Sequence, residues 1–306
     1  MSVAYITHPA CLEHEMGAHH PEQPARLNAI NDRLVASGLS MVLIHHDALP
    51  AELRHLHLAH EREYVEEVYA HSPNEGHVWL DPDTAMNPHT LDAALHAAGA
   101  VVQAVDLVMQ EAVKQAFCSV RPPGHHAERS CSMGFCIFNN VAIGAYHALE
   151  TYDLQRVAIV DFDVHHGNGT EDIVSGDERI LFCSTFQHPF YPHSGYQSSA
   201  ENVVNVPLAK GSTGEAFREA VYNMWLPRLR AFEPQLILVS AGFDAHQADD
   251  MAGLNLIDDD FRWVTQKICE VAEESGHGRV VSSLEGGYDL QALARSVEAH
   301  IRAFYG

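Results

Sequence analysis

The chain has 306 residues, of which 46% are hydrophobic, and its 18 basic and 41 acidic residues give a formal net charge of -23. This much apolar material can build a sizeable core, which excludes a largely disordered chain. A strongly acidic surface repels phosphate backbones and attracts cations, so we expect no nucleic-acid partner and a field suited to lysine-bearing or polyamine substrates.

The predicted elements alternate between helices and short apolar strands. In chain order they are a helix over 90–112, a strand over 116–120, a helix over 140–150, strands over 157–160 and 180–183, a helix over 215–232, a strand over 236–239, a helix over 259–274 and a strand over 280–284. Short, continuous apolar runs are typical of strands buried on both faces of a parallel sheet. The alternation predicts an α/β fold with a central, mostly parallel sheet flanked by helices. No linker or repeat divides the chain, so we expect a single domain over 1–306.

A polar segment follows each of the five predicted strands. These segments cover residues 121–126, 161–170, 184–186, 240–244 and 285–288. In parallel α/β sheets, ligands bind in the crevice outside the carboxyl ends of the strands. We therefore expect the five segments to converge on one edge of the sheet and to form an active site there.

The segment after the second of these strands has the composition of a metal site. Asp161, Asp163 and His165 alternate along an extended strand end, which predicts that they face one side. Asp244, at the end of another strand, offers a further carboxylate. Carboxylate and imidazole ligands with an open position suit catalytic Zn²⁺ and also accept Fe²⁺, Co²⁺ or Mn²⁺. The alternative, turn-capping aspartates and a core histidine, explains single residues better than the whole set.

Two further motifs supply proton donors and acceptors. His125 and His126 follow a Pro-Pro-Gly turn, and an imidazole titrates near neutral pH, as a general acid or base must. Asp161 and Asn168 could each orient a histidine by accepting its Nδ1–H. Tyr288 follows two glycines, where it could donate to a developing oxyanion. Other His-His pairs, at 19–20 and 45–46, lack this context, and a tyrosine packed at a loop edge is the alternative for Tyr288.

Five motifs resemble, in the same order, those of the histone deacetylase family, and in particular its class II-like branch with the bacterial deacetylase-like and acetylpolyamine amidohydrolases. The motifs are Arg-Pro-Pro-Gly-His-His126, Gly-Phe-Cys-Ile-Phe-Asn-Asn140, Asp161-x-Asp-x-His-His-Gly-Asn-Gly-Thr170, Ser-Ala-Gly-Phe-Asp-Ala245 and Leu-Glu-Gly-Gly-Tyr288. The resemblance extends from about residue 14 to about residue 290. It implies the arginase/deacetylase fold, with the active site at the C-terminal ends of the strands.

The resemblance also implies a role for each chemical group. One catalytic zinc ion would be bound by Asp163, His165 and Asp244. His126, with the zinc, would activate a water and then protonate the leaving amine. Tyr288, with the zinc, would polarise the acetyl carbonyl, and His125, buttressed by Asp161, would contribute electrostatically.

The resemblance implies a substrate tunnel and a second cation as well. Gly134, Phe135 and Tyr191 match positions that line the family's narrow acyl-lysine tunnel, and Met251 matches an apolar gatekeeper. His193 stands where many relatives have Gly, so the rim near Tyr191 is expected to differ. A structural monovalent cation, usually potassium, would be held by the Ser184 side chain and by the backbone oxygens of Asp161, Asp163, His165 and Thr185.

These observations predict a zinc-dependent deacetylase that hydrolyses the acetyl-amide of acetyl-lysine-like substrates through a metal-activated water. Met251 and the absence of a long insertion favour acyl-lysine over acetylpolyamines. An acetylpolyamine or small-amide hydrolase is the first alternative, and a non-catalytic acyl-lysine-binding protein is the second. A manganese ureohydrolase is discounted because the Asp-rich pattern of a two-metal cluster is missing. Asp81 and Asp83 could meet a cationic substrate, but we predict a solvated turn there.

Cysteine usage and the N-terminus indicate the compartment. Six scattered cysteines without a Cys-x-x-Cys pair are typical of a reducing environment. Cys131 and Cys136 lie in the loop after His126, and we expect both to be inert. We find neither a secretory signal pattern nor an apolar run of 18 residues. We therefore expect a cytoplasmic protein with no membrane partner, as a monomer or a homodimer.

Overall fold

The computed structural model describes residues 2–197 and 200–306. Its main sheet consists of β1 (Val3–Thr7), β2 (Ile44–Asp47), β5 (Gln115–Cys118), β6 (Val157–Asp161), β7 (Ile180–Gln187), β8 (Val203–Leu208), β9 (Leu236–Ala241) and β10 (Val280–Leu284). The spatial order is β2-β1-β5-β10-β9-β6-β7-β8, and every neighbouring pair is parallel. This confirms the predicted α/β fold with a central parallel sheet.

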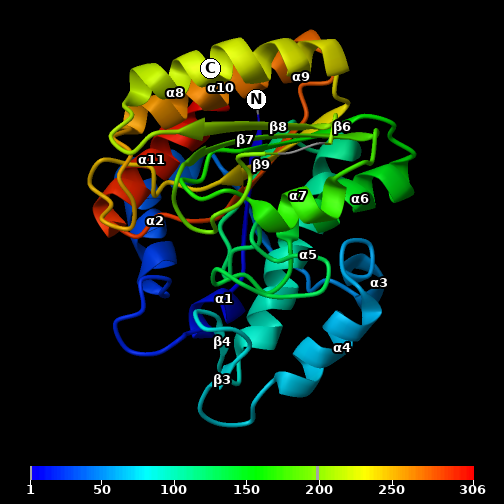
Figure 1. The fold of residues 1–306 in the computed structure, drawn as a ribbon, viewed down its shortest axis with the longest axis vertical. Helices are drawn as coiled ribbons and strands as arrows, with labels where there is room; N and C mark the ends of the chain where they lie inside the picture. The colour runs from blue at the N-terminus through cyan, green and yellow to red at the C-terminus, as the bar shows by residue number, and fades with distance from the viewer. Residues whose placement is uncertain (1, 198–199) are drawn as a thin grey trace.

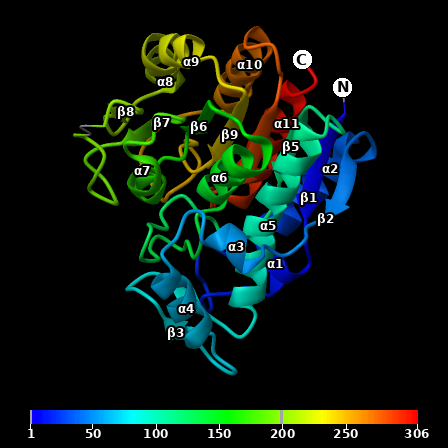
Figure 2. The same cartoon turned by 90° about the vertical axis from the view of Figure 1, so that its right-hand side faces the viewer.

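Helices cover both faces of the sheet. On one face lie α5 (Thr90–Met109), α6 (Asn140–Tyr152) and α7 (Asn168–Val174). The opposite layer contains α2 (Ala25–Ala36), α8 (Gly214–Ala220), α9 (Leu226–Phe232), α10 (Asp258–Glu274) and α11 (Leu290–Ala303). Figure 1 shows α8, α9 and α10 on one side of the sheet and α5, α6 and α7 on the other, and Figure 2 shows the same layers from the side.

A smaller set of elements lies outside the sheet and its two main helical layers. It contains α1 (Ala10–Glu13), α3 (Leu53–Leu56), α4 (Arg62–His71) and the antiparallel pair β3 (Val78–Trp79) and β4 (Ala85–Met86). Figure 1 shows α1 and α3 on either side of α5, and α4, β3 and β4 lower in the view, away from the sheet. The turn between β3 and β4 carries Asp81, Asp83 and Thr84, which bear on the site below.

The central strands are apolar because both of their faces are covered. All residues of β6, β9 and β10 are buried, so the chain needs no polar face at these positions. The five predicted strands agree with the structure to within a few residues at each end. In β7, however, the strand continues to Gln187, so Ser184 and Thr185 lie inside it rather than in a segment after it.

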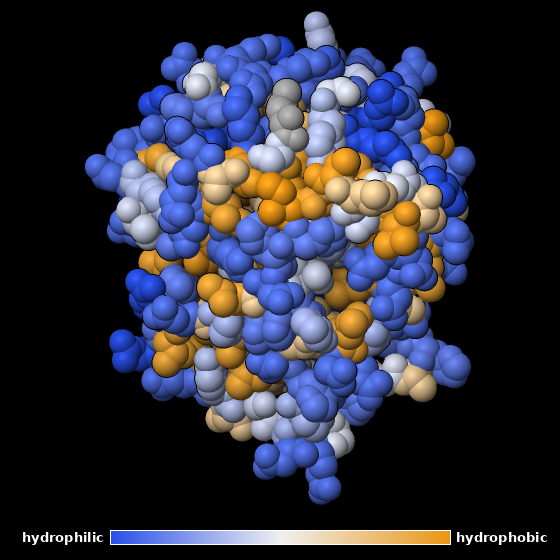
Figure 3. All heavy atoms as spheres, turned by 180° about the vertical axis from the view of Figure 1, so that it is seen from behind, coloured by the Kyte–Doolittle hydropathy of each residue, from blue (hydrophilic) through white to orange (hydrophobic). Residues whose placement is uncertain are grey.

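The segment 215–232 is helical throughout, as predicted, although a π-helical turn at Val221–Trp225 separates α8 from α9. The expectation of no long apolar run was wrong, because α5 is long enough to cross a membrane and has a window of mean hydropathy 1.4. That window is 67% buried inside the protein, as in a core helix. The surface seen from behind is mostly hydrophilic, with separate apolar patches (Figure 3).

Candidate active site

Four neighbouring strand ends bring several of the predicted site residues to one pocket. Because β5, β10, β9 and β6 are adjacent in the sheet, the segments that follow them meet at its carboxyl edge. The pocket has a volume of about 190 Å³. It is lined by Asp83, Pro123, His125, His126, Gly134, Phe135, His165, Phe190, Tyr191, Met251, Gly286 and Tyr288. All four residues predicted to contact substrate are therefore at the pocket.

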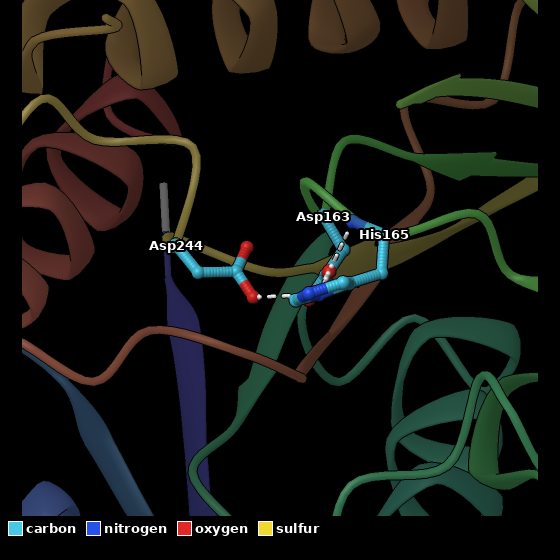
Figure 4. Close-up of side chains that lie close together, drawn as sticks. All are labelled: Asp163, His165 and Asp244. Carbon is cyan, nitrogen blue, oxygen red and sulfur yellow. Dashed lines mark hydrogen bonds and ion pairs between the residues drawn. The ribbon is translucent and has the colours of Figure 1, made fainter. Parts of the chain in front are cut away.

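Asp163, His165 and Asp244 come together beside the pocket, which His165 lines. Their ligand atoms all lie within 4.8 Å of one another. His165 Nδ1 is 3.0 Å from Asp163 Oδ1 and 3.2 Å from Asp244 Oδ2. Figure 4 shows the Asp244 carboxylate and the His165 ring pointing toward each other. Asp244 follows β9, whereas Asp163 and His165 follow β6. The three residues meet because β6 and β9 are direct neighbours in the sheet, with Asp161 opposite Ser240.

The donor set fits a divalent cation such as zinc. All three residues are buried, and Asp244 Oδ2 has no hydrogen-bond partner of good geometry within residues 2–197 and 200–306. Burial lowers the pKa of His165, but the adjacent carboxylates of Asp163 and Asp244 outweigh it and raise the pKa to about 10. Two buried carboxylates around one imidazole also favour a metal cation. Two carboxylates and one imidazole are ligands that zinc accepts in open catalytic sites.

Two glycines leave room for these carboxylates. A Cβ on Gly242 would lie 2.0 Å from Asp163 Oδ2, and one on Gly286 would lie 2.1 Å from Asp244 Oδ2. The Gly286 N–H also donates to Asp163 Oδ2 at 2.8 Å. The backbone of two strand ends thus packs directly against the ligand carboxylates and orients them.

His125 and His126 are neighbours with different partners. His125 Nδ1 is 3.0 Å from Asp161 Oδ2, and His126 Nδ1 is 2.7 Å from Asn168 Oδ1. Asp161 therefore lies outside the metal group and pairs with a histidine instead. Both orienting contacts are those that the sequence indicated.

The two histidines differ in charge because their surroundings differ. Burial lowers the pKa of His125, but Asp163 and Asp161 outweigh this and raise the pKa to about 10. Burial, together with the nearby His125 and His165, holds the pKa of His126 well below its usual value. A neutral imidazole can accept a proton, so His126 is the group suited to general base chemistry.

Glu285 supports the histidine loop and was not predicted as a site residue. One of its carboxylate oxygens accepts the N–H of Gly124 at 2.7 Å and the N–H of His125 at 3.1 Å. The Ser240 hydroxyl donates to the other oxygen at 3.2 Å. Burial raises the pKa of Glu285 to about 7. Its position in the Leu-Glu-Gly-Gly-Tyr motif was the signal available in the sequence.

Tyr288 reaches the pocket from a loop that two other residues hold. Asp249 Oδ2 accepts the backbone N–H of Tyr288 at 2.6 Å and that of Asp289 at 3.1 Å. The Arg26 guanidinium lies 5.0 Å from the centroid of the Tyr288 ring, and Arg26 Nε donates to Gly287 O at 2.7 Å. Burial raises the pKa of Tyr288 well above its usual value, so the phenol stays protonated as a donor.

Arg26 belongs to a buried ion network that the sequence did not reveal. Glu22 pairs with Arg26 at 3.0 Å and also with Arg121, and all three side chains are fully buried. Arg121 in turn donates to the backbone oxygens of Cys11 and His14. The network ties the N-terminal loop to the segment that carries Tyr288.

The turn between β3 and β4 contributes to the pocket wall. The prediction of a solvated turn was wrong for Asp83, which lines the pocket and accepts the Gly134 N–H at 3.0 Å. Thr84 accepts the Phe135 N–H at 3.0 Å, so the two side chains hold the tunnel residues in place. Gly134 has a φ of +57°, and a Cβ there would lie 2.3 Å from His126 Cδ2. Glycine is therefore required at this position.

Two residues of the predicted potassium site, Asp161 and Ser184, lie side by side in the sheet. Ser184 lies opposite Asp161 in the β6–β7 pair, and Ser184 Oγ is buried with no hydrogen-bond partner in the described part of the chain.

Of the two cysteines in the loop after His126, Cys136 is buried, whereas Cys131 is exposed. Partial burial of its sulfur and the charge of Glu128 raise the pKa of the Cys131 thiol to about 12, so it stays protonated and poorly reactive.

Comparison with known proteins agrees with this geometry. The family model of the histone deacetylase domain matches residues 20–304. The chain is 34% identical to the histone deacetylase-like amidohydrolase of Pseudomonas aeruginosa, over 93% of this chain and 81% of that protein. It is 36% identical to the mouse polyamine deacetylase HDAC10, over 93% of this chain and 45% of that protein. The solved HDA15 HD domain superposes with a TM-score of 0.93 at 32% identity, covering 99% of this chain and 89% of that one.

The parallel sheet, the strand-end pocket and the Asp-His-Asp group beside it define an α/β protein of the arginase/deacetylase fold. The chain belongs to the histone deacetylase family, and the family supports deacetylase activity. The resemblance stated from the sequence motifs is thereby confirmed.

Proposed function

We propose that the chain is a zinc-dependent deacetylase that hydrolyses the acetyl-amide of acetyl-lysine-like substrates. One observation carries the proposal: a pocket walled by aromatic side chains holds the His126 imidazole, the Tyr288 phenol and one residue of a group able to bind a metal. Amide hydrolysis needs an activated water, a site for the oxyanion and a proton for the leaving amine. The pocket offers a group for each requirement.

A zinc ion held by Asp163, His165 and Asp244 would supply Lewis acidity and lower the pKa of water at the site to about 7. His126, neutral and anchored through Nδ1, accepts the proton of the attacking water at Nε2 and then transfers it to the departing amine. The Tyr288 hydroxyl donates a hydrogen bond to the developing oxyanion. Positively charged His125, held by Asp161, adds favourable electrostatics beside the site.

The walls of the pocket favour a long aliphatic chain. The Phe135 and Tyr288 rings meet edge to face, with centroids 6.1 Å apart, and Tyr191 packs edge to face on His126 at 5.3 Å. Met251 adds an apolar group at the rim. A lysine side chain has the length and apolar stem to fill such a pocket while its acetyl group reaches the inner end.

Acetylated polyamines are the second candidate substrate. Asp83 lines the pocket, and the chain carries a net charge of -23, both of which favour a polycation. The apolar Met251 at the rim favours the peptide substrate.

We further propose that the chain is a single catalytic domain and that it acts in the cytoplasm. We also propose that it binds a structural potassium ion near Ser184 and Thr185, which the unpartnered Ser184 hydroxyl supports.

The test is a hydrolysis assay with zinc-reconstituted protein on an acetyl-lysine peptide and on acetylspermidine, run side by side. We expect faster turnover of the peptide, loss of turnover on chelation and its return with zinc. The His126→Ala variant should bind one zinc per chain and lose turnover, because only the base is removed. The exposed Asp250→Ala variant serves as the matched control and should keep full activity.

The outcomes separate the candidates. Preference for acetylspermidine would keep the mechanism and replace the substrate. No turnover of either substrate at full zinc occupancy would refute the proposal and favour a non-catalytic acyl-lysine-binding protein.

A further inference from the structure

Asn168 orients the proposed base, yet an amide side chain can face either way. Its Oδ1 lies 2.7 Å from His126 Nδ1. With that orientation the amide accepts, His126 carries its proton on Nδ1, and Nε2 is free to accept a proton from water. With the amide reversed, the NH₂ group would face Nδ1, and His126 would have to carry its proton on Nε2. The base would then be blocked.

Glu128 stands on the other side of the same amide. Its Oε1 lies 2.7 Å from Asn168 Nδ2. A carboxylate only accepts hydrogen bonds, so it requires the NH₂ group of Asn168 on its own side and hence the oxygen on the side of His126. The two weaker acceptors near Nδ2, His126 O at 3.5 Å and Met133 Sδ at 3.1 Å, favour the same orientation.

Glu128 is itself well anchored. Its backbone N–H donates to Cys131 O at 2.9 Å, and its carbonyl accepts from His60 Nδ1 at 2.9 Å. His60 is buried and accepts the Asn139 N–H at Nε2, so Nδ1 must be its donor. The Cys131 thiol donates to the second carboxylate oxygen, Oε2, at 3.4 Å. Glu128 therefore presents Oε1 to Asn168 from a held position, outside the pocket lining.

We infer that Glu128 is a positioning residue that orients the Asn168 amide and thereby sets the His126 tautomer required for base catalysis. The relay runs from Glu128 Oε1 through the Asn168 amide to His126 Nδ1, and its polarity is set by the carboxylate at its outer end. Glu128 touches neither the pocket nor the metal group, so it acts only through Asn168. The inference rests on the proposed deacetylase function for its kinetic consequence but not for its structural one.

The structural test needs no activity. Zinc-free protein with ¹⁵N-labelled histidine reports the tautomer through the ring-nitrogen shifts, with His126 assigned by its loss in His126→Gln. We expect His126 in the wild type to be protonated at Nδ1 alone. Glu128→Ala should give a mixture of tautomers, and Glu128→Gln, whose amide oxygen can still accept, should largely keep the wild-type state. An unchanged His126 spectrum in Glu128→Ala would overturn the inference.

The kinetic test exchanges the amide and the carboxylate between positions 128 and 168. Glu128→Ala should lower kcat about 10-fold with little change in KM, the usual effect of losing an outer partner of a site residue. In Asn168→Asp two carboxylates would meet at the 2.7 Å contact, so kcat should fall. In the double variant Glu128→Gln/Asn168→Asp, the Gln NH₂ can donate to the new carboxylate, which again accepts from His126, and kcat should recover at least 5-fold over Asn168→Asp.

The exposed carboxylate variant Glu67→Gln, which removes the same charge elsewhere, should match the wild type. A double variant no better than Asn168→Asp, or an unimpaired Asn168→Asp, would overturn the inference. If the wild type itself shows no turnover, the proposed function fails, while the tautomer measurement still decides the role of Glu128.

Discussion

Asp249 links the proposed oxyanion donor to the rim of the pocket, which makes it a sharp test of the loop geometry. It is buried, with Oδ2 accepting the N–H groups of Tyr288 and Asp289 and Oδ1 accepting that of Met251 at 3.1 Å. In Asp249→Ala all three donors lose their acceptor. Each unsatisfied buried donor costs about 1–3 kcal/mol. Met251, Tyr288 and Asp289 are all partly exposed, so water can replace part of the lost acceptor and each donor costs about 1 kcal/mol, the lower end of that range.

The three donors together cost about 3 kcal/mol, and the variant recovers part of this because it no longer buries a carboxylate. We therefore expect a net loss of about 2 kcal/mol in the free energy of unfolding, measured by urea denaturation. Because Tyr288 loses its anchor, kcat should fall by about 100-fold, the effect of removing one oxyanion donor, with zinc content unchanged. Asp250→Ala, at the exposed neighbour, is the control. A loss below about 1 kcal/mol together with near wild-type kcat would refute the assigned role of Asp249.

Three further changes test other parts of the structure. Gly286→Ala places a Cβ 2.1 Å from Asp244 Oδ2, so zinc binding, measured by chelator competition, should weaken by at least about 10-fold. An unchanged affinity for zinc would contradict the site geometry. Burial lowers the pKa of His300 from 6.5 to about 3, so acidification protonates the unfolded chain first. Between pH 6.5 and about pH 3, His300 should therefore lower the free energy of unfolding by about 1.4 kcal/mol per pH unit. His300→Phe removes this group, so the pH dependence measured in urea titrations should become less steep. His193 has a φ of +66°, so His193→Gly should stabilise the fold by about 1 kcal/mol, whereas a loss of stability would show that its side chain makes a needed contact.

The sequence predicted the groups that do chemistry because such groups stand directly after apolar strands. Asp163, His165, Asp244 and His126 were all found by that pattern. The structure groups the first three, and His165 and His126 line the pocket. The strand neighbours were not predictable in the same way. Only the sheet order shows that β6 and β9 are adjacent, which is why two ligand segments far apart in the chain can share an ion.

The supporting residues left no such pattern. Glu285, Asp249 and Glu128 act by accepting particular N–H groups, and an isolated acidic residue in a chain with 41 of them carries no mark of its partner. The edge strand β2 was missed because its sequence, Ile-His-His-Asp, is largely exposed and has no apolar run. Asp83 was misjudged because exposure cannot be read from a turn sequence when a neighbouring loop covers it.

The place of β10 in the sheet has a consequence for synthesis of the chain. It is the last of the eight strands to leave the ribosome, yet it lies between β5 and β9 in the middle of the sheet. At about 5–20 residues per second, the nascent chain waits about 2–9 s between the end of β9 and the end of β10. During that interval two half-sheets expose apolar strand edges, which favour wrong pairing and call for shielding by chaperones. The Gly286 contact to Asp163 forms only afterwards, so the metal site reaches its final shape after nearly the whole chain has been made.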